Sequence, residues 1–186
     1  ADIETNAIEN TKTYGWPTLS GLSEMYCMTF INPATDEVYE FNQGKNNIEE
    51  GIEMLKNTEY VVGHNFIGFD AVALFKLYGL RLNTVIDTML MSKVMFPDLE
   101  DQDNIKQVKF PEEWKGSWSR HKLAAWGIRL NEPKSEFSDF SKFTEEMQTY
   151  CTQDVKTNVV LYKHLLDQKK SSKALVLEHE FAKTVT

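Results

Sequence analysis

The sequence predicts an α/β fold in which helices pack against a mixed β-sheet. Short strand-like segments dominate the first third of the chain, and helical patterns then alternate with short buried strands. The 186 residues are 41% hydrophobic and 12% aromatic, which is enough for the core of one domain. No stretch approaches the roughly 20 apolar residues of a membrane-spanning helix, and no signal peptide is recognisable.

Each element is predicted from local periodicity and turn residues. Alternating patterns bounded by turns predict strands at residues 2–4, 24–32, 37–42, 60–63 and 82–86. Apolar stripes at helical spacing predict helices over residues 47–56, 70–78, 87–95, 120–126 and 144–168, and over the closing residues 177–186. Gly79 suits the C-terminal end of the second of these helices. Residues 97–119 lose all periodicity and are expected to form a polar loop.

The charge balance bears on possible partners. Twenty Lys and Arg against twenty-eight Asp and Glu give a net charge of −8 and an isoelectric point near 5.1. A protein that binds nucleic acid mainly by neutralising phosphates is normally basic, so any such attraction must be local or come from another domain. Cys27 and Cys151 form no Cys-x-x-Cys pair, which indicates a reducing compartment, and the scattered histidines do not predict a zinc site.

Asp2 and Glu4 are the first candidate functional residues. Alternate residues of a strand share one face, so both carboxylates would project from the same side of the sheet. This is how a strand presents two oxygen ligands to one hard cation. The chain holds a second Asp-x-Glu sequence at 98–100, which we interpret as a solvated surface segment because it follows a proline in the polar loop.

Two further candidates lie on predicted helices. Asp70 opens a helix after a buried strand and a glycine-containing turn, a position that also suits an ordinary N-terminal cap. Tyr150 and Asp154 are four residues apart and therefore share one helix face, although the tyrosine could simply pack by its ring. If the first strand lies beside both helices, four carboxylates converge, and their mutual repulsion implies bound divalent metal.

These motifs resemble the DEDD superfamily of exonucleases, in its tyrosine-bearing DEDDy branch. The matching motifs are Asp2-x-Glu4, His64-Asn65-x-x-x-Phe69-Asp70 and Tyr150-x-x-x-Asp154. Within that branch the sequence is most similar to the 3′–5′ proofreading domain of family A DNA polymerases of the bacteriophage replicative kind. The similar segments are ADIETNAI, VVGHNFIGFDAVAL, IDTMLMSKV, RHKLAAWGIRL, YCTQDVKTNVVLYKHLL and LEHEFA.

The resemblance implies a fold and a reaction. The fold would be ribonuclease-H-like, a mixed five-stranded sheet flanked by helices. The reaction would be hydrolysis of the 3′-terminal phosphodiester of DNA with two divalent ions, Mg²⁺ or Mn²⁺, releasing nucleoside monophosphates. By the same resemblance Asp2, Glu4 and Asp154 hold one ion, and Asp70 reaches a second that Asp2 shares. Tyr150 would orient the attacking water, because an ordinary tyrosine pKa of about 10 makes it a poor general base.

Substrate contacts are also implied by the resemblance. Asn65 and Phe69 match positions that contact the terminal nucleotide, although Phe69 suits the core equally well. Thr5 and Asn6 follow the first motif, where main-chain contacts to the 3′ end are expected. Asp87 and Thr88 match a family segment too, and there we favour a helix-capping aspartate.

The domain organisation follows from the same similarity. Residues 1–170 would form the exonuclease domain, and residues 171–186 would begin a helix that leads into an absent polymerase domain. A start inside a strand and a stop inside a helix suggest a piece of a longer polypeptide. The expected partner is a single-stranded or frayed 3′ end of DNA, in the cytoplasm of a bacterial host, with no membrane involved.

Two other functions stay open on the sequence. A DEDDy exoribonuclease resembling RNase D would continue into a helical RNA-binding domain, whereas LEHEFA favours a polymerase continuation. A catalytically silent interaction module would keep the fold but not the activity, and the presence of all four carboxylates and the tyrosine disfavours it. The 97–119 loop and Arg120 could touch DNA through Trp114, Lys115, Trp118 and Arg120, but we favour a surface loop whose tryptophans pack onto the core.

Overall fold

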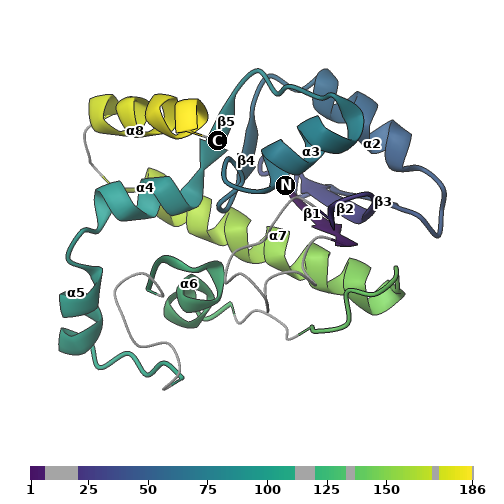
Figure 1. The fold of residues 1–186 in the computed structure, drawn as a ribbon. Coiled ribbons are helices and arrows are strands. Elements are labelled where there is room, and N and C mark those ends of the chain that lie inside the picture. The colour runs from purple at the N-terminus through teal and green to yellow at the C-terminus, as the bar shows by residue number, and fades with distance from the viewer. Residues whose placement is uncertain (7–20, 112–119, 133–136, 169–171, 186) are drawn as a thin grey trace.

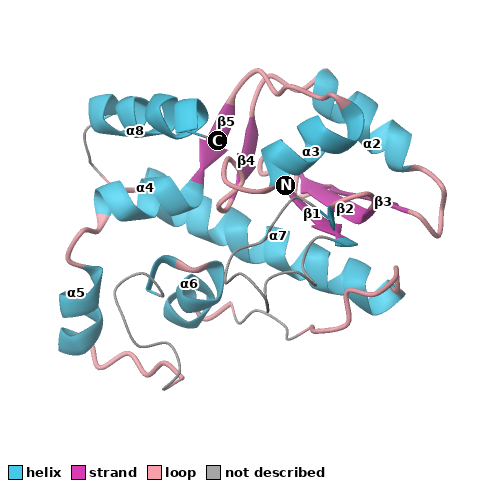
Figure 2. Ribbon diagram, viewed as in Figure 1, coloured by secondary structure: helices cyan, strands magenta, loops and turns pink. Residues whose placement is uncertain are grey.

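A computed structural model gives the fold of the protein, and it describes residues 1–6, 21–111, 120–132, 137–168 and 172–185. The strands, in chain order, are β1 (Asp2–Thr5), β2 (Met25–Ile31), β3 (Val38–Asn42), β4 (Val61–Gly63) and β5 (Val85–Asp87). The helices are α2 (Ile48–Lys56), α3 (Asp70–Tyr78), α4 (Thr88–Met95), α5 (Leu99–Ile105), α6 (Leu123–Leu130), α7 (Glu145–Leu166) and α8 (Ser172–Val185). The predicted α/β class is confirmed (Figure 2).

The strands form two sheets instead of the single five-stranded sheet that was expected. β1, β2 and β3 pair in that order and antiparallel, whereas β4 and β5 pair parallel to each other. The Ala1 nitrogen, which lies just before β1, donates a hydrogen bond to the Val62 carbonyl of β4 at 2.7 Å. Two residues after Ala1, the Ile3 N–H donates to the Asp70 side chain and not to a strand carbonyl.

Helices cover both faces of the antiparallel sheet. α2 packs against β2 and β3 on one side, and the long helix α7 crosses β1, β2 and β3 on the other (Figure 1). This position explains why β2, which carries the hydrophobic sequence MYCMTFI, is buried along nearly its whole length. Farther along the chain, α8 lies beside α4 and β5.

Most predicted elements are confirmed, with small differences at their ends. α7 begins after Thr144, whose hydroxyl caps the Met147 amide, and α3 ends at Gly79 with a left-handed φ of 65°. α6 begins three residues later than expected, and β5 covers Val85–Asp87 instead of residues 82–86. Among the described residues, no helix is long and apolar enough to cross a membrane.

The prediction of a loop over residues 97–119 is wrong in part, because α5 occupies seven of these residues. Its sequence, LEDQDNI, has too few apolar residues to show helical periodicity. The helix is held instead by the burial of Leu99 and by an ion pair in which Arg129 grips both oxygens of Asp103, at 2.8 and 2.6 Å. The predicted solvated segment at 98–100 is therefore partly buried.

Candidate active site

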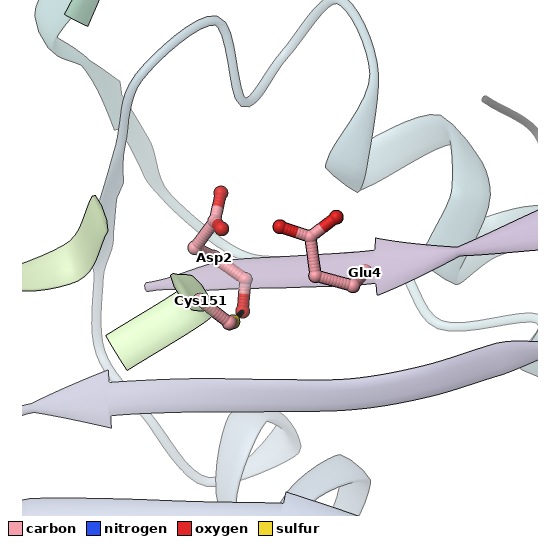
Figure 3. Close-up of side chains that lie close together, drawn as sticks. All are labelled: Asp2, Glu4 and Cys151. Atoms are coloured by element: carbon pink, nitrogen blue, oxygen red, sulfur yellow. Dashed lines mark hydrogen bonds between the residues drawn. The ribbon is translucent and has the colours of Figure 1, made fainter. Parts of the chain in front are cut away.

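The carboxylates of Asp2 and Glu4 lie on the same side of β1, as the alternation along a strand predicts (Figure 3). One ligand atom from each of Asp2, Glu4 and Cys151 lies within 4.8 Å of the other two. Glu4 is only 5% exposed. Two acidic groups are thus held close together on one strand, β1.

Cys151 is the member of this group that sequence reasoning missed. It is fully buried on α7, and its thiol contacts the Asp2 carbonyl at 3.6 Å. Burial, followed by the neighbouring Cys27 and Asp2, raises the pKa of the Cys151 thiol well above its ordinary value. A signal was available: Cys151 is three residues from Asp154, so both belong to the helix face that meets β1.

Asp70 joins this region from the start of α3. It is the first residue of α3 and 5% exposed, and its Oδ1 accepts a hydrogen bond from the Ile3 amide at 3.2 Å. Burial raises the pKa of Asp70 well above its usual range, and the charge of Asp2 raises it further. Asp70 therefore lies near Asp2, as expected, and the charge of Asp2 contributes to the shift in its pKa.

Asp154 and Tyr150 lie on α7, as predicted. Asp154 is 4% exposed, so the alternative of a solvent-exposed carboxylate does not hold. The Tyr150 ring is half-buried against Phe137 and Phe140, with ring centroids 5.5 and 6.1 Å away. Neither Asp70 nor Asp154 belongs to the group of ligand atoms within 4.8 Å, so the four carboxylates are less tightly gathered than the sequence suggested.

A chain of buried polar side chains fixes α7 against the antiparallel sheet. The Asn42 amide donates to Gln148 Oε1 at 2.9 Å, and Gln148 Nε2 donates to the Thr29 hydroxyl at 2.8 Å. The Thr29 and Thr152 hydroxyls are 3.0 Å apart, and Thr152 donates to Glu40 at 2.7 Å. The Asn42 amide nitrogen can only donate and the Glu40 carboxylate can only accept. The hydroxyls of Thr29 and Thr152 therefore donate toward Glu40. This network sets the position of α7 along the strands.

The predicted substrate residues lie at the ends of two strands. Asn65 is exposed and has a left-handed φ of 58°, whereas Phe69 is half-buried and packs against the core. Thr5 is fully buried, and the Asn6 side chain bonds Ser23 and the Glu24 amide. The Asn6 side chain thus links the end of β1 to the residues just before β2, and main-chain contacts of Thr5 and Asn6 to a ligand stay a prediction.

Arg120, one of the four residues considered for DNA contact, is engaged within the protein. Its guanidinium lies 3.6 Å from Asp103 and 3.9 Å from Glu100, and it stacks over the Phe110 ring. Trp114, Lys115 and Trp118 lie outside the described residues. A cavity of about 280 Å³ is lined by Ala1 and by residues of β2, β3, α2, β4 and α7, and by none of the candidate site residues.

The donor set of the site suits a hard divalent cation. Asp2 and Glu4 offer carboxylate oxygens from one side of β1, which is the ligand type that Mg²⁺ and Mn²⁺ prefer. Burial first, and the charge of Asp2 second, disfavour the ionised form of Asp70, and a bound cation would offset both effects. Asp2, Glu4 and Cys151 form a group capable of holding a metal ion, in which the thiol is the softest donor.

Comparison with known proteins shows similarity to phage polymerases, while no family model matches the chain. The chain is 33% identical to the DNA-directed DNA polymerase of Enterobacteria phage T3 over 143 aligned residues, covering 62% of this chain and 20% of that protein. It is 34% identical to the DNA-directed DNA polymerase of Escherichia phage T7 over 137 residues, covering 59% and 19%. The chain, which spans about a fifth of these relatives, is thus similar to one part of a phage DNA polymerase.

Proposed function

We propose that this chain is a 3′–5′ exodeoxyribonuclease domain that proofreads DNA during replication. The observation that carries the proposal is the pair Asp2 and Glu4 on one side of β1, with Asp70 bonded to the same strand at Ile3. The similarity of the chain to phage DNA polymerases supports it, because a proofreading nuclease acts together with a polymerase. The reaction adds water to the terminal phosphorus, breaks its bond to the preceding 3′ oxygen and releases a nucleoside monophosphate.

The proposal includes a ribonuclease-H-like sheet in the order β3-β2-β1-β4-β5. Its support is the hydrogen bond from the Ala1 nitrogen to the Val62 carbonyl, which places the start of β1 beside β4. The Ile3 bond to Asp70, which follows β4 in the chain, indicates that β1 and β4 run in the same direction. Asp70 then serves two purposes, since its carboxylate satisfies the edge of β1 and also faces the site.

The carboxylates would hold the metal ions. Asp2, Glu4 and Asp154 would bind one ion, and Asp70 would bind a second that Asp2 shares. Two bound divalent ions supply a nucleophile at neutral pH and stabilise charge on the attacking and leaving oxygens. Of the three residues grouped with this site, Cys151 would act as a support and the carboxylates as the ligands, because burial raises the pKa of its thiol and the thiol contacts the Asp2 carbonyl.

The other site residues would act on water and on the DNA end. The Tyr150 hydroxyl would orient the attacking water, and the contacts of its ring with Phe137 and Phe140 restrict its motion. Asn65, which is exposed, would contact the terminal nucleotide, with Phe69 beside it. The main chain of Thr5 and Asn6 would position the 3′ end.

We further propose that residues 1–170 form the nuclease and that residues 171–186 lead into a polymerase region. The two phage relatives are named DNA-directed DNA polymerases and are about five times longer than the matched part. Most of the affinity for DNA would come from that region, consistent with the net charge of −8. The partner is a single-stranded or frayed 3′ end, within the cytoplasm of a phage-infected bacterium.

A gel assay tests the activity and the site together. The substrate is a 5′-labelled single-stranded DNA oligonucleotide, incubated with Mg²⁺, with Mn²⁺ or with a chelator. We expect a metal-dependent ladder that shortens from the 3′ end, and a loss of more than about a hundredfold in the Asp2→Ala, Glu4→Ala variant. The matched control is Asp98→Ala, Glu100→Ala, which removes the same pair at the same spacing from the start of α5.

Each alternative function gives a different result. Equal degradation of RNA and DNA would favour an exoribonuclease. A folded wild-type protein that cleaves neither substrate with either metal would contradict the proposal and favour an interaction module. Equal activity of the two double variants would mean that the hydrolysis arises from a contaminant or from another site.

A further inference from the structure

Asp87 makes more hydrogen bonds than a helix cap needs. The residue is 2% exposed, and its Oδ1 accepts from the amides of Met89 and Leu90 at 2.9 and 3.3 Å, which is the expected capping of α4. The same oxygen also accepts from the Asn65 amide at 3.0 Å, and Oδ2 accepts from the Ile67 amide at 3.1 Å. These last two bonds reach the loop that follows β4, about twenty residues earlier in the chain.

That loop joins β4 to the helix that begins with Asp70. Asn65 has a left-handed backbone that only a few residue types adopt readily, and the Gly68 amide bonds its carbonyl at 3.1 Å. The Phe66 carbonyl accepts from the Ala71 amide at 2.9 Å, so the loop is continuous with the first turn of α3. Fixing the amides of Asn65 and Ile67 therefore fixes the direction of the exposed Asn65 side chain.

We propose that Asp87 is a positioning residue that holds the loop of residues 64–69 so that Asn65 meets the terminal nucleotide of the DNA. The inference rests on the proposed function for the identity of the ligand, and on the hydrogen bonds for the effect on the loop. Asp87 contacts neither the DNA nor the metal-binding carboxylates in this arrangement. It acts through the two amides.

Helix α8 also contacts Asp87, through the side chain of His179. The Asp87 amide donates to Nε2 of His179 at 2.8 Å, and Nδ1 of His179 is 2.7 Å from the Leu175 carbonyl. Since Nε2 accepts, Nδ1 carries the proton, and the imidazole links the end of β5 to α8. The loop is therefore held by Asp87, and Asp87 is held by the last described helix.

The two carboxylate oxygens permit a variant that separates capping from positioning. In Asp87→Asn the remaining oxygen can keep the place of Oδ1, which caps α4, because asparagine is as good an N-cap as aspartate. The amide nitrogen then faces the Ile67 N–H, so two donors meet and the Ile67 bond is lost, while Oδ1 can still accept from the Asn65 amide. Asp87→Ser offers a second variant that still caps a helix but has a single oxygen.

The experiment has one readout for the loop and two for its effect on the substrate. Hydrogen–deuterium exchange follows the Asn65 and Ile67 amides, and KM for a DNA oligonucleotide is compared with hydrolysis of bis(p-nitrophenyl) phosphate, which has no nucleoside. For Asp87→Asn and Asp87→Ser we expect at least tenfold faster exchange at Ile67 and about a tenfold higher KM for DNA. Turnover of the small ester should change less than twofold. Asp98→Asn, at the exposed start of α5, is the control and should behave as wild type in all readouts.

The outcomes separate this inference from the proposed function. Unchanged exchange and unchanged KM in both variants would overturn it and leave Asp87 as a helix cap. A parallel loss of activity on both substrates would also overturn it, because it would indicate general damage to the site. If the wild type hydrolyses neither substrate, the proposed function fails, and weaker binding of a fluorescent DNA trinucleotide together with faster exchange at Ile67 would still support the loop anchor.

Discussion

The two halves of the candidate site are held by different kinds of interaction. Asp2, Glu4 and Asp154 lie on β1 and α7. Hydrogen bonds between buried side chains, with Gln148 at the centre, tie α7 to β2 and β3, and β1 pairs with β2. The loop half, which includes Asn65 and leads to Asp70, is held by hydrogen bonds from backbone amides to one carboxylate, Asp87. We call these the strand–helix half and the loop half.

The difference teaches where each half is vulnerable. In the strand–helix half the supporting side chains belong to the core of the domain, so losing one destabilises the whole fold. In the loop half the supported segment is short and partly exposed, and losing its anchor releases a few residues while the core stays intact. Stability measurements should therefore report on the first half, and local measurements on the second.

The largest expected effect is a loss of stability in Gln148→Leu. The leucine leaves the Asn42 amide buried without its acceptor and removes one donor to the Thr29 hydroxyl. A buried polar group that loses its partner costs about 1–3 kcal/mol, so we expect the free energy of unfolding to fall by about 3 kcal/mol. Chemical denaturation followed by circular dichroism measures this change.

The matched control is Gln153→Leu, the same substitution on the same helix at a half-buried position. It should change the free energy of unfolding by about 1 kcal/mol or less. If both variants lose the same stability, the buried network does not hold α7, and the contrast between the two halves disappears.

The loop half was easier to predict from sequence than the strand–helix half. Asp70 after a buried strand, Gly79 at the helix end and Asp87 before a helix are local signals, and the structure bears out each position. The partners of Gln148 lie more than one hundred residues away, so no local pattern reveals them. Prediction in the loop half is also incomplete. The sequence predicts that Asp87 caps α4, but it does not predict the hydrogen bonds from the Asn65 and Ile67 amides to Asp87.

Tertiary contacts also explain two places where the fold prediction and the structure differ. α5 escaped notice because an ion pair from Arg129 to Asp103 and one buried leucine hold it, and neither creates a periodic apolar stripe. The five-stranded sheet was expected from a resemblance, whereas the described strands pair as two sheets. The Ala1 nitrogen bonds Val62 of β4, and the Ile3 amide bonds Asp70 of α3. The spacing of the motifs predicted that Asp2 and Glu4 lie together. The distances between the acidic side chains depend on packing that the sequence does not reveal.

A smaller effect of opposite sign is expected from Asp70→Asn in the presence of a chelator. Burial and the charge of Asp2 raise the folded-state pKa of Asp70, so the folded protein holds this proton more tightly than the unfolded chain does. The resulting stability is fully present at low pH and is lost as pH rises through the folded-state pKa. The variant avoids this loss, and its melting temperature at pH 7 should exceed that of wild type by a few degrees.

Divalent metal should reverse the order of the two proteins. Mg²⁺ or Mn²⁺ offsets the repulsion between Asp2 and Asp70 in wild type. The variant has no charge at position 70, so wild type gains more in melting temperature. The variant should also lose nuclease activity. A variant that is less stable than wild type at pH 7 in chelator would show that the hydrogen bond from Ile3 outweighs the repulsion, and that this junction of the two halves is not strained.

The smallest effect concerns acid and the support of the loop half. α4, which begins at Asp87, is tied to α6 through Ser92, whose hydroxyl lies 2.6 Å from His121 Nδ1 and accepts from the Trp126 indole at 2.9 Å. Burial, with help from the charges of Lys93 and Arg129, lowers the pKa of His121 to about 4, so the folded protein holds a neutral imidazole.

The sign of the pH effect follows from this lowered pKa. Between pH 6.5 and about 4 the unfolded chain binds a proton at His121 that the folded protein refuses, so stability falls as pH falls through this window. His121→Gln cannot titrate, and the wild type should lose roughly 1 kcal/mol more than the variant, or about 2–4 °C in melting temperature. The strand–helix network contains amides and hydroxyls with one carboxylate and no histidine, so amide protection in α7 should fall less than in α4. Equal loss of protection in both helices would mean that the two halves unfold as one unit, and that their different supports do not make them separable.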